Sequence, residues 1–162
     1  MWLRDNFSRT LKLWSYDADL PLQIETDFGG KTASRSPALA VVATQVFDRR
    51  RRIVGVQSRL LTKSERNRID CGEGVDSSTV AEVLAIAYGA QTFLPWLKAS
   101  KHNLLFKTDN KNITHWRSSD SAIFVWLRDK FRQLNIDLAR IRIQHIHRKT
   151  SVSYTHLRAH ET

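Results

Sequence analysis

Pro21-Leu-Gln-Ile-Glu-Thr-Asp-Phe-Gly-Gly30 is the stretch of sequence that decides the fold prediction. Apolar and polar side chains alternate over its first half, which is the period of a half-buried strand. Gly29 and Gly30 then permit a sharp turn, because a residue without a Cβ adopts backbone conformations that other residues resist. Asp27 is therefore expected at the C-terminal end of a strand. A carboxylate held there can bind a hard cation such as Mg²⁺, or it can be a solvated side chain in a hairpin turn.

A second stretch, Asn103-Leu-Leu-Phe-Lys-Thr-Asp-Asn110, is another apolar run that closes on Thr-Asp. Thr26-Asp27 and Thr108-Asp109 therefore look like equivalent strand ends. Between them, the apolar residues of segment 77–97 recur at helical spacing. Glu82 lies one turn into this expected helix, next to its apolar stripe. A Glu in that place can be a functional ligand, or it can serve only the helix dipole.

The three acids belong to an ordered set of segments: Thr26-Asp27-Phe28-Gly29, Ser58-Arg59-Leu60-Leu61-Thr62 with Glu65, Glu82-Val83-Leu84-Ala85-Ile86, and Thr108-Asp109-Asn110. This set resembles the ribonuclease H domain that follows reverse transcriptase in retroviruses and LTR retrotransposons, and the gypsy-type elements match it best. The resemblance runs from about Leu20 to Ile146. Two features depart from the family pattern: Phe28-Gly29 replaces Ala-Ser, and the loop from Arg66 to Ser77 is longer than usual.

The resemblance implies an α/β fold of the ribonuclease H type, a five-stranded mixed sheet in the order β-β-β-α-β-α-α-β, with helices packed on it and the closing helix missing. It implies a metal-dependent endonuclease, part of a reverse transcriptase polyprotein, that hydrolyses the RNA strand of RNA–DNA hybrids. Asp27, Glu82 and Asp109 would be both its catalytic residues and the ligands of a two-ion site for Mg²⁺, with Mn²⁺ as a substitute. The expected partners are an RNA–DNA hybrid and the upstream polymerase region, with no membrane.

The same resemblance divides the chain into parts. Residues 1–19 are interpreted as the end of a connecting region, and residues 20–150 as the ribonuclease H-like domain. Residues 151–162 are interpreted as a non-native tail, because the peptide from Val152 to Leu157 matches a translated transposase-end sequencing adaptor. A genuine polar tail is the alternative. The fourth metal-binding acid of the family lies in the closing helix and has no match here, so this fragment is expected to be impaired.

The remaining segments are assigned by their patterns. Segments 38–48 and 53–61 are expected to be strands, with arginines 49–52 at a hairpin tip, either as a solvated turn or as a phosphate contact. Segment 65–76 is predicted to be an acidic loop, and the spacing of its acidic residues does not match an EF-hand. The further expectations are an N-cap at Ser77 or Ser78, a short helix at 111–116, a helix from about Ser121 to Asn135 with Trp126 and Phe131 in the core, and a last strand at 136–146.

The composition is strongly basic, with a formal charge of +10 and a pI near 10.3. Such a charge favours a polyanion partner, because each neutralised phosphate releases counterions, although it can also serve solubility alone. Lys107, Lys111 and Arg117 are candidate phosphate contacts. Cys71 is the only cysteine, which argues against a disulfide scaffold and favours an intracellular location: the cytoplasm, a virus-like particle or the nucleus.

Two other classes of protein share part of this pattern. A catalytically inactive connection or nucleic-acid-binding module of a retroelement polyprotein would keep the ribonuclease H fold without the cleavage. An integrase-type relative would place its Glu after both Asp residues. Here Glu82 lies between Asp27 and Asp109, which disfavours the integrase interpretation.

Overall fold

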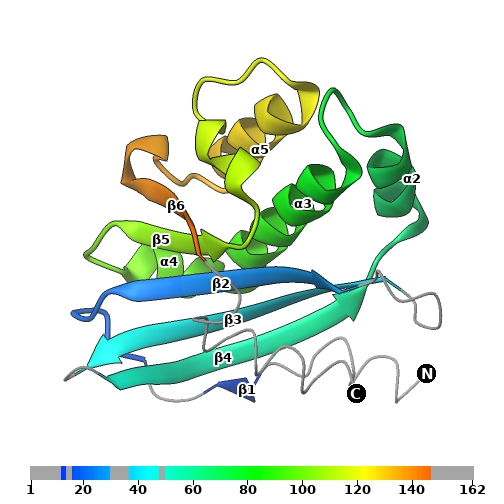
Figure 1. Ribbon diagram of the computed structural model, residues 1–162. Helices are drawn as coiled ribbons and strands as arrows, with labels where there is room; N and C mark the ends of the chain where they lie inside the picture. Colours follow the sequence, from blue (N-terminus) through cyan, green and yellow to red (C-terminus); the bar gives the residue numbers. More distant parts are fainter. Residues whose placement is uncertain (1–11, 14–15, 30–36, 48–49, 147–162) are drawn as a thin grey trace.

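A computed structural model describes residues 12–13, 16–29, 37–47 and 50–146 of the chain. Most of the predicted connecting region and the whole of the predicted non-native tail at residues 151–162 lie outside the described residues. Figure 1 shows a sheet with the main helices gathered over one of its faces, as expected for a ribonuclease H-like α/β fold.

The sheet has strands in the order β1-β4-β3-β2-β5-β6. Three long strands form an antiparallel meander, and β5 and β6 continue the sheet in parallel on the β2 side. This confirms the predicted five-stranded mixed sheet, which a two-residue strand, β1, extends at the β4 edge. The strands are β1 (Lys12–Leu13), β2 (Leu22–Gly29), β3 (Ala38–Phe47), β4 (Arg50–Leu60), β5 (Leu104–Thr108) and β6 (Ile141–His145).

Helix α3 (Ser77–Thr92) lies across the sheet and supplies much of the core (Figure 1). Every residue from Thr79 to Ala90 is buried. The helix comes close to the sheet at Gly89, where a Cβ would lie 3.1 Å from Ile24 Cγ2 and 3.3 Å from Val41 Cγ1. A glycine lets the helix dock at this distance without displacing its neighbours. The position of α3 over β2 and β3 is therefore set by tight packing.

The other helices surround α3. Helix α5 packs against it and buries Phe131, as predicted, whereas Trp126 is only partly buried and has the Arg68 guanidinium 4.6 Å above its ring. The bounds are α2 (Lys63–Cys71), α4 (Leu94–Ala99), η1 (Lys111–His115), α5 (Ala122–Gln133) and η2 (Leu138–Arg140), where η marks a 3-10 helix. Among the described residues, no helix is both long enough and apolar enough to cross a membrane.

The structure corrects one prediction at helix α2, because residues 65–71 were expected in a loop. A capping box starts the helix: Thr62 Oγ1 accepts a hydrogen bond from the Glu65 N–H at 3.1 Å, and Glu65 Oε1 accepts one from the Thr62 N–H at 2.9 Å. Arg59 also holds the Glu65 carboxylate, with donor–acceptor distances of 2.7 and 2.9 Å. The Thr-x-x-Glu signal of a helix start was present in the sequence.

The arginine run lies at the β3–β4 hairpin, as predicted, but it also extends into the strand. Arginines 50–52 lie in β4 and pair with the end of β3. Arg51 is anchored there because its Nη1 lies 2.5 Å from Oε1 of Glu25 on β2, whose side chain is only 2% exposed. The ion pair therefore extends the strand into the charged segment.

Two caps also move predicted boundaries. The N-cap of α3 is Asp76, whose Oδ1 accepts from the Thr79 N–H at 2.7 Å, and not one of the two serines that follow. The last strand begins at Ile141 and not at residue 136, because a 3-10 turn capped by Asp137 comes before it. In both places a short Asp side chain supplies the acceptor that begins the turn.

Candidate metal centre

Three acidic side chains from three separate elements meet at one edge of the sheet. Asp27 comes from β2, Glu82 from α3, and Asp109 directly follows β5. One carboxylate oxygen of each lies within 4.8 Å of the corresponding oxygens of the other two. Asp27 and Glu82 are buried and Asp109 is partly exposed. The residues that the sequence singled out are therefore close enough to share a cation.

The backbone explains why the two Asp residues meet. Strands β2 and β5 run parallel and side by side, with Glu25 opposite Lys107 in the register. Asp27 and Asp109 each follow this pair by two residues, so both side chains reach the same edge of the sheet. The carboxyl ends of neighbouring parallel strands are where α/β proteins commonly gather ligand-binding residues.

Glu82 is only 4% exposed. Its burial, followed by the charges of Asp109 and Asp27, raises the pKa of this carboxyl well above its ordinary value. The Thr108 hydroxyl donates to Glu82 Oε2 at 3.1 Å, and the backbone N–H of Phe28 also donates to this carboxylate. These two donors offset only part of the effects of burial and repulsion, so the carboxyl favours its protonated form unless a cation balances the negative charges.

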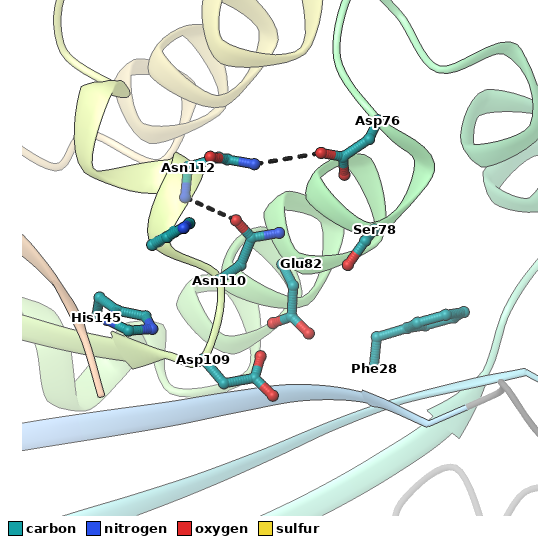
Figure 2. A pocket seen from close by; sticks show the side chains of 9 residues that line it. Phe28, Asp76, Ser78, Glu82, Asp109, Asn110, Asn112 and His145 are labelled. Carbon is teal, nitrogen blue, oxygen red and sulfur yellow. Dashed lines mark hydrogen bonds between the residues drawn. The ribbon is translucent and has the colours of Figure 1, made fainter. Parts of the chain in front are cut away.

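A pocket of about 410 Å³ opens beside Glu82 and Asp109, whereas Asp27 is not among its lining residues. Figure 2 shows the carboxylates of Glu82 and Asp109 pointing toward one another, with Phe28 on one side and His145 on the other. The pocket is lined by Phe28, Asp76, Ser78, Glu82, Asp109, Asn110, Lys111, Asn112 and His145. Apart from Phe28, the lining residues all carry polar or charged side chains, which suits a charged or hydrogen-bonding ligand.

Hydrogen bonds between α3 and the loop after β5 hold the rim of this pocket. Asn112 Nδ2 donates to Asp76 Oδ2 at 3.2 Å, and Asn110 Nδ2 donates to Thr79 Oγ1 at 3.2 Å. The Asn112 N–H donates to Asn110 Oδ1 at 2.8 Å, as Figure 2 also shows. The loop that carries Asp109 is thus tied to the helix that carries Glu82.

The three candidate phosphate contacts have different surroundings. Lys111 is exposed and lines the pocket. Lys107 is 8% exposed and is not among the lining residues. Arg117 donates to the backbone carbonyl of Ile141 and stacks over the Trp116 ring, which gives it a structural contact. Of the three, only Lys111 is placed at the pocket.

Sequence reasoning assigned no role to His145, Asn112 or Asp76. His145 closes β6, where it pairs in register with Thr108 of β5. Because β6 is the third parallel strand to end at this edge, its last side chain reaches the pocket. The signal was available, since a polar residue at the end of a strand parallel to two Asp-bearing strands is expected beside them.

In the Ser58–Thr62 segment, which belongs to the family resemblance, Arg59 stabilises the fold. The Arg59 guanidinium lies 4.6 Å from the centre of the Tyr88 ring while it binds both oxygens of Glu65. It thereby joins β4, α2 and α3, and none of these side chains lines the pocket.

Comparison with solved structures identifies the architecture. LC11-RNase H1, isolated from compost by a metagenomic approach and solved in complex with an RNA/DNA hybrid, aligns with a TM-score of 0.57 and 13% identity over 84% of this chain and 92% of its own. The fold is that of ribonuclease H. At this identity the likeness concerns the fold alone.

Part of a viral protein also aligns. The foamy viral protease-reverse transcriptase in complex with double-stranded DNA gives a TM-score of 0.53 and 8% identity over 83% of this chain and 21% of its own. The same viral protein in complex with an RNA/DNA hybrid aligns with a TM-score of 0.50 and 14% identity. This alignment covers 88% of this chain and 19% of the viral chain. The sequence matches no protein-family model and no curated protein.

Proposed function

We propose that this chain is a ribonuclease H-type endonuclease that depends on divalent metal ions and hydrolyses the RNA strand of RNA–DNA hybrids. The observation that carries the proposal is the meeting of Asp27, Glu82 and Asp109 within 4.8 Å at the edge of the sheet. The fold supports it, because LC11-RNase H1, which shares this fold, was solved with an RNA/DNA hybrid.

The three acids fit Mg²⁺, with Mn²⁺ as a substitute. They offer only carboxylate oxygens, which hard cations prefer. Two of the three are buried, and buried negative charges close together are costly unless a cation offsets them. When bound, a pair of divalent ions supplies the Lewis-acid stabilisation that phosphodiester hydrolysis needs.

The chain's own side chains then have distinct tasks. Asp27, Glu82 and Asp109 hold the cations. His145 stands at the pocket wall beside Asp109 (Figure 2), and imidazole is the side chain that most often transfers protons near neutral pH. Lys111 offers an exposed ammonium group at the pocket for a backbone phosphate.

The substrate class follows from the charge and the pocket lining. A formal charge of +10 favours a nucleic acid. The hydroxyl and amide groups of Ser78, Asn110 and Asn112 line the pocket, and such groups can bond to a 2′-OH, the group that distinguishes RNA from DNA. Selection by duplex shape and 2′-OH contacts is therefore proposed in place of base reading.

We also propose that the domain belongs to the reverse transcriptase of a gypsy-type LTR retroelement, with a polymerase region upstream as its partner. The ordered sequence segments support this origin, and so does the shared fold of the foamy viral protease-reverse transcriptase. Sequencing upstream of Met1 tests it. A polymerase Tyr-x-Asp-Asp or Phe-x-Asp-Asp box in the same frame is expected, and an unrelated upstream frame would refute the origin.

The enzymatic proposal is tested with a labelled RNA–DNA hybrid and the purified chain in Mg²⁺, Mn²⁺ or EDTA. Slow cleavage of the RNA strand is expected with either metal, because only three acids come together among the described residues where the family resemblance implies four, and no cleavage is expected in EDTA. Asp109→Asn should lower the rate at least about 100-fold, since it removes one ligand. Asp129→Asn is the matched control, because Asp129 is exposed on α5 and pairs only with the neighbouring Arg132 among the contacts described.

The second candidate is an inactive nucleic-acid-binding module of the same fold. Within the described residues three acids come together, whereas the family resemblance implies four, and this favours testing binding separately. Fluorescence anisotropy with the same hybrid measures binding in Ca²⁺. Tight binding without cleavage in Mg²⁺ or Mn²⁺ would favour the module, and metal-dependent cleavage would exclude it.

A further inference from the structure

We propose that Thr108 is a positioning residue that holds the Glu82 carboxylate for metal binding, whereas Thr26, which precedes the other Asp in the same way, has no such part. The inference rests on the proposed metal site. It separates two Thr-Asp pairs that look identical in the sequence, and the structure gives them different surroundings.

Thr108 is in direct contact with the acid. Its Oγ1 donates to Glu82 Oε2 at 3.1 Å, and both side chains are nearly inaccessible, at 1% and 4% exposure. Water therefore has little room to replace the bond. A hydroxyl-to-carboxylate bond in such surroundings is stronger than the same bond in water.

A second contact sets the direction of the Thr108 hydroxyl. The backbone N–H of Asn110 donates to Thr108 Oγ1 at 3.2 Å. A hydroxyl has one proton to donate, and the Asn110 N–H occupies a lone pair on the acceptor side. The Thr108 proton is thus directed toward Glu82, and the turn after β5 fixes this arrangement.

The same turn is fastened to α3, the helix that carries Glu82. Asn110 Nδ2 donates to Thr79 Oγ1 at 3.2 Å, one turn before Glu82. Thr108, Asn110 and Thr79 therefore form one connected set between the strand end and the helix. The set ties Glu82 to the strand that precedes Asp109, so both ligands keep their relative positions before a cation arrives.

Thr26 presents the contrast. It is also buried, at 5% exposure, but its Oγ1 has no hydrogen-bond partner among the described residues. Its methyl group faces α3, since a Cβ built on Gly89 would lie 3.4 Å from Thr26 Cγ2. Thr26 packs as a small apolar residue would. Replacing its hydroxyl by a methyl group should therefore leave the free energy of unfolding unchanged.

The test compares Thr108→Val, Thr108→Ser and Thr26→Val with the wild-type chain. Mn²⁺ is titrated into each metal-free protein, and the Kd is measured by calorimetry and by the electron spin resonance of free Mn²⁺. Thr108→Val should weaken binding by roughly 10-fold or more, as for other partners of metal ligands. Thr108→Ser keeps the hydroxyl and should stay within about 3-fold of the wild type, and Thr26→Val should be unchanged.

Each outcome decides between specific alternatives. If the wild type binds no Mn²⁺, the proposed metal site itself fails. If the wild type binds Mn²⁺ and Thr108→Val binds it equally well, the positioning role is refuted, and the same holds if Thr108→Ser loses as much affinity as Thr108→Val. Should the valine variant not fold, Thr108→Ala against Thr108→Ser isolates the hydroxyl, and equal Kd values for that pair would overturn the proposal.

Discussion

Asn112 Nδ2 donates a hydrogen bond to Asp76 Oδ2 at 3.2 Å, while Asp76 Oδ1 accepts from the Thr79 N–H at 2.7 Å. One carboxylate therefore caps α3 and ties that helix to the turn after β5. Glu82 lies on this helix, and Asp109 lies in this turn. The cap of a helix and the spacing of two metal-site acids thus depend on the same side chain.

Replacing Asp76 should weaken this connection in steps. Asp76→Ala is expected to lower the free energy of unfolding by about 1 kcal/mol, the usual cost of an N-cap. Asp76→Asn keeps an acceptor for the Thr79 N–H but places an amide opposite Asn112, so about half that loss is expected. Urea unfolding measures both variants, and an asparagine variant less stable than the alanine variant would contradict the capping argument.

Glu82→Gln should change how stability depends on pH. Burial and the neighbouring acids raise the pKa of Glu82 above 4.5, so between 4.5 and its folded value the folded chain binds more protons than the unfolded chain. The contribution of Glu82 to wild-type stability must then fall as pH rises through this window. The glutamine variant, compared in EDTA, should match the wild type near pH 4 and become the more stable protein toward pH 8.

The exposed loop residue Asp120 provides the control for that pH series. Asp120→Asn should follow the wild-type curve in parallel, because no buried charge is removed. A gap between Glu82→Gln and the wild type that is constant from pH 4 to 8 would show that the charge of Glu82 is not the cause.

Metal addition should stabilise the wild-type chain. A ligand that binds only the folded state at 100 times its Kd adds about 2.7 kcal/mol to the free energy of unfolding. Thermal unfolding with increasing Mg²⁺ should show a rising midpoint for the wild type and a much smaller rise for Asp109→Asn. NaCl at equal ionic strength is the control, and equal midpoint shifts in both salts would point to screening and not to binding.

Glu65→Gln should lower stability at neutral pH by roughly 1–2 kcal/mol, because it weakens both the capping box and the two bonds from Arg59. Burial raises the pKa of Glu65, but the hydrogen bonds from Arg59 and Thr62 outweigh it and leave the pKa below 4.5. The unfolded chain therefore takes up the proton first as pH falls, and the difference from the wild type should vanish at low pH.

A matched control for Glu65 is the exposed ion pair between Asp129 and Arg132. Asp129→Asn is expected to change stability by less than about 0.5 kcal/mol at any pH, as exposed pairs do. Guanidinium is unsuitable for these comparisons because it screens charge, so urea titrations measure both variants.

Gly55→Ala should destabilise the fold through overpacking. A Cβ at this position of β4 would lie 2.6 Å from Phe93 Cε1 and 2.9 Å from Trp96 Cζ3, two rings that stack with centroids 5.1 Å apart. A loss of about 1–3 kcal/mol is expected. Adding Phe93→Leu should recover part of this loss, and strict additivity of the two changes would argue against a steric clash.

Local patterns predicted much of this fold. The alternation before Asp27 and the helical spacing around Glu82 each reflect one buried face, so they were visible along the chain. Helix α2 was missed because its residues have no buried face, and only the Thr62–Glu65 capping box marks it. Arg51 was placed in a turn because its partner, Glu25, lies on a strand 26 residues earlier.

The sequence by itself determined which residues could bind a hard cation, because carboxylates at strand ends and in a helix start are recognisable without their neighbours. Only the tertiary structure decided that their oxygens meet within 4.8 Å and that His145 lines the same pocket as Glu82 and Asp109. It also decided that the Thr108 hydroxyl binds Glu82 while that of Thr26 binds no described residue. The physical reason is that a hydrogen bond depends on which group packing brings within about 3 Å, and that group is 26 residues away in the chain.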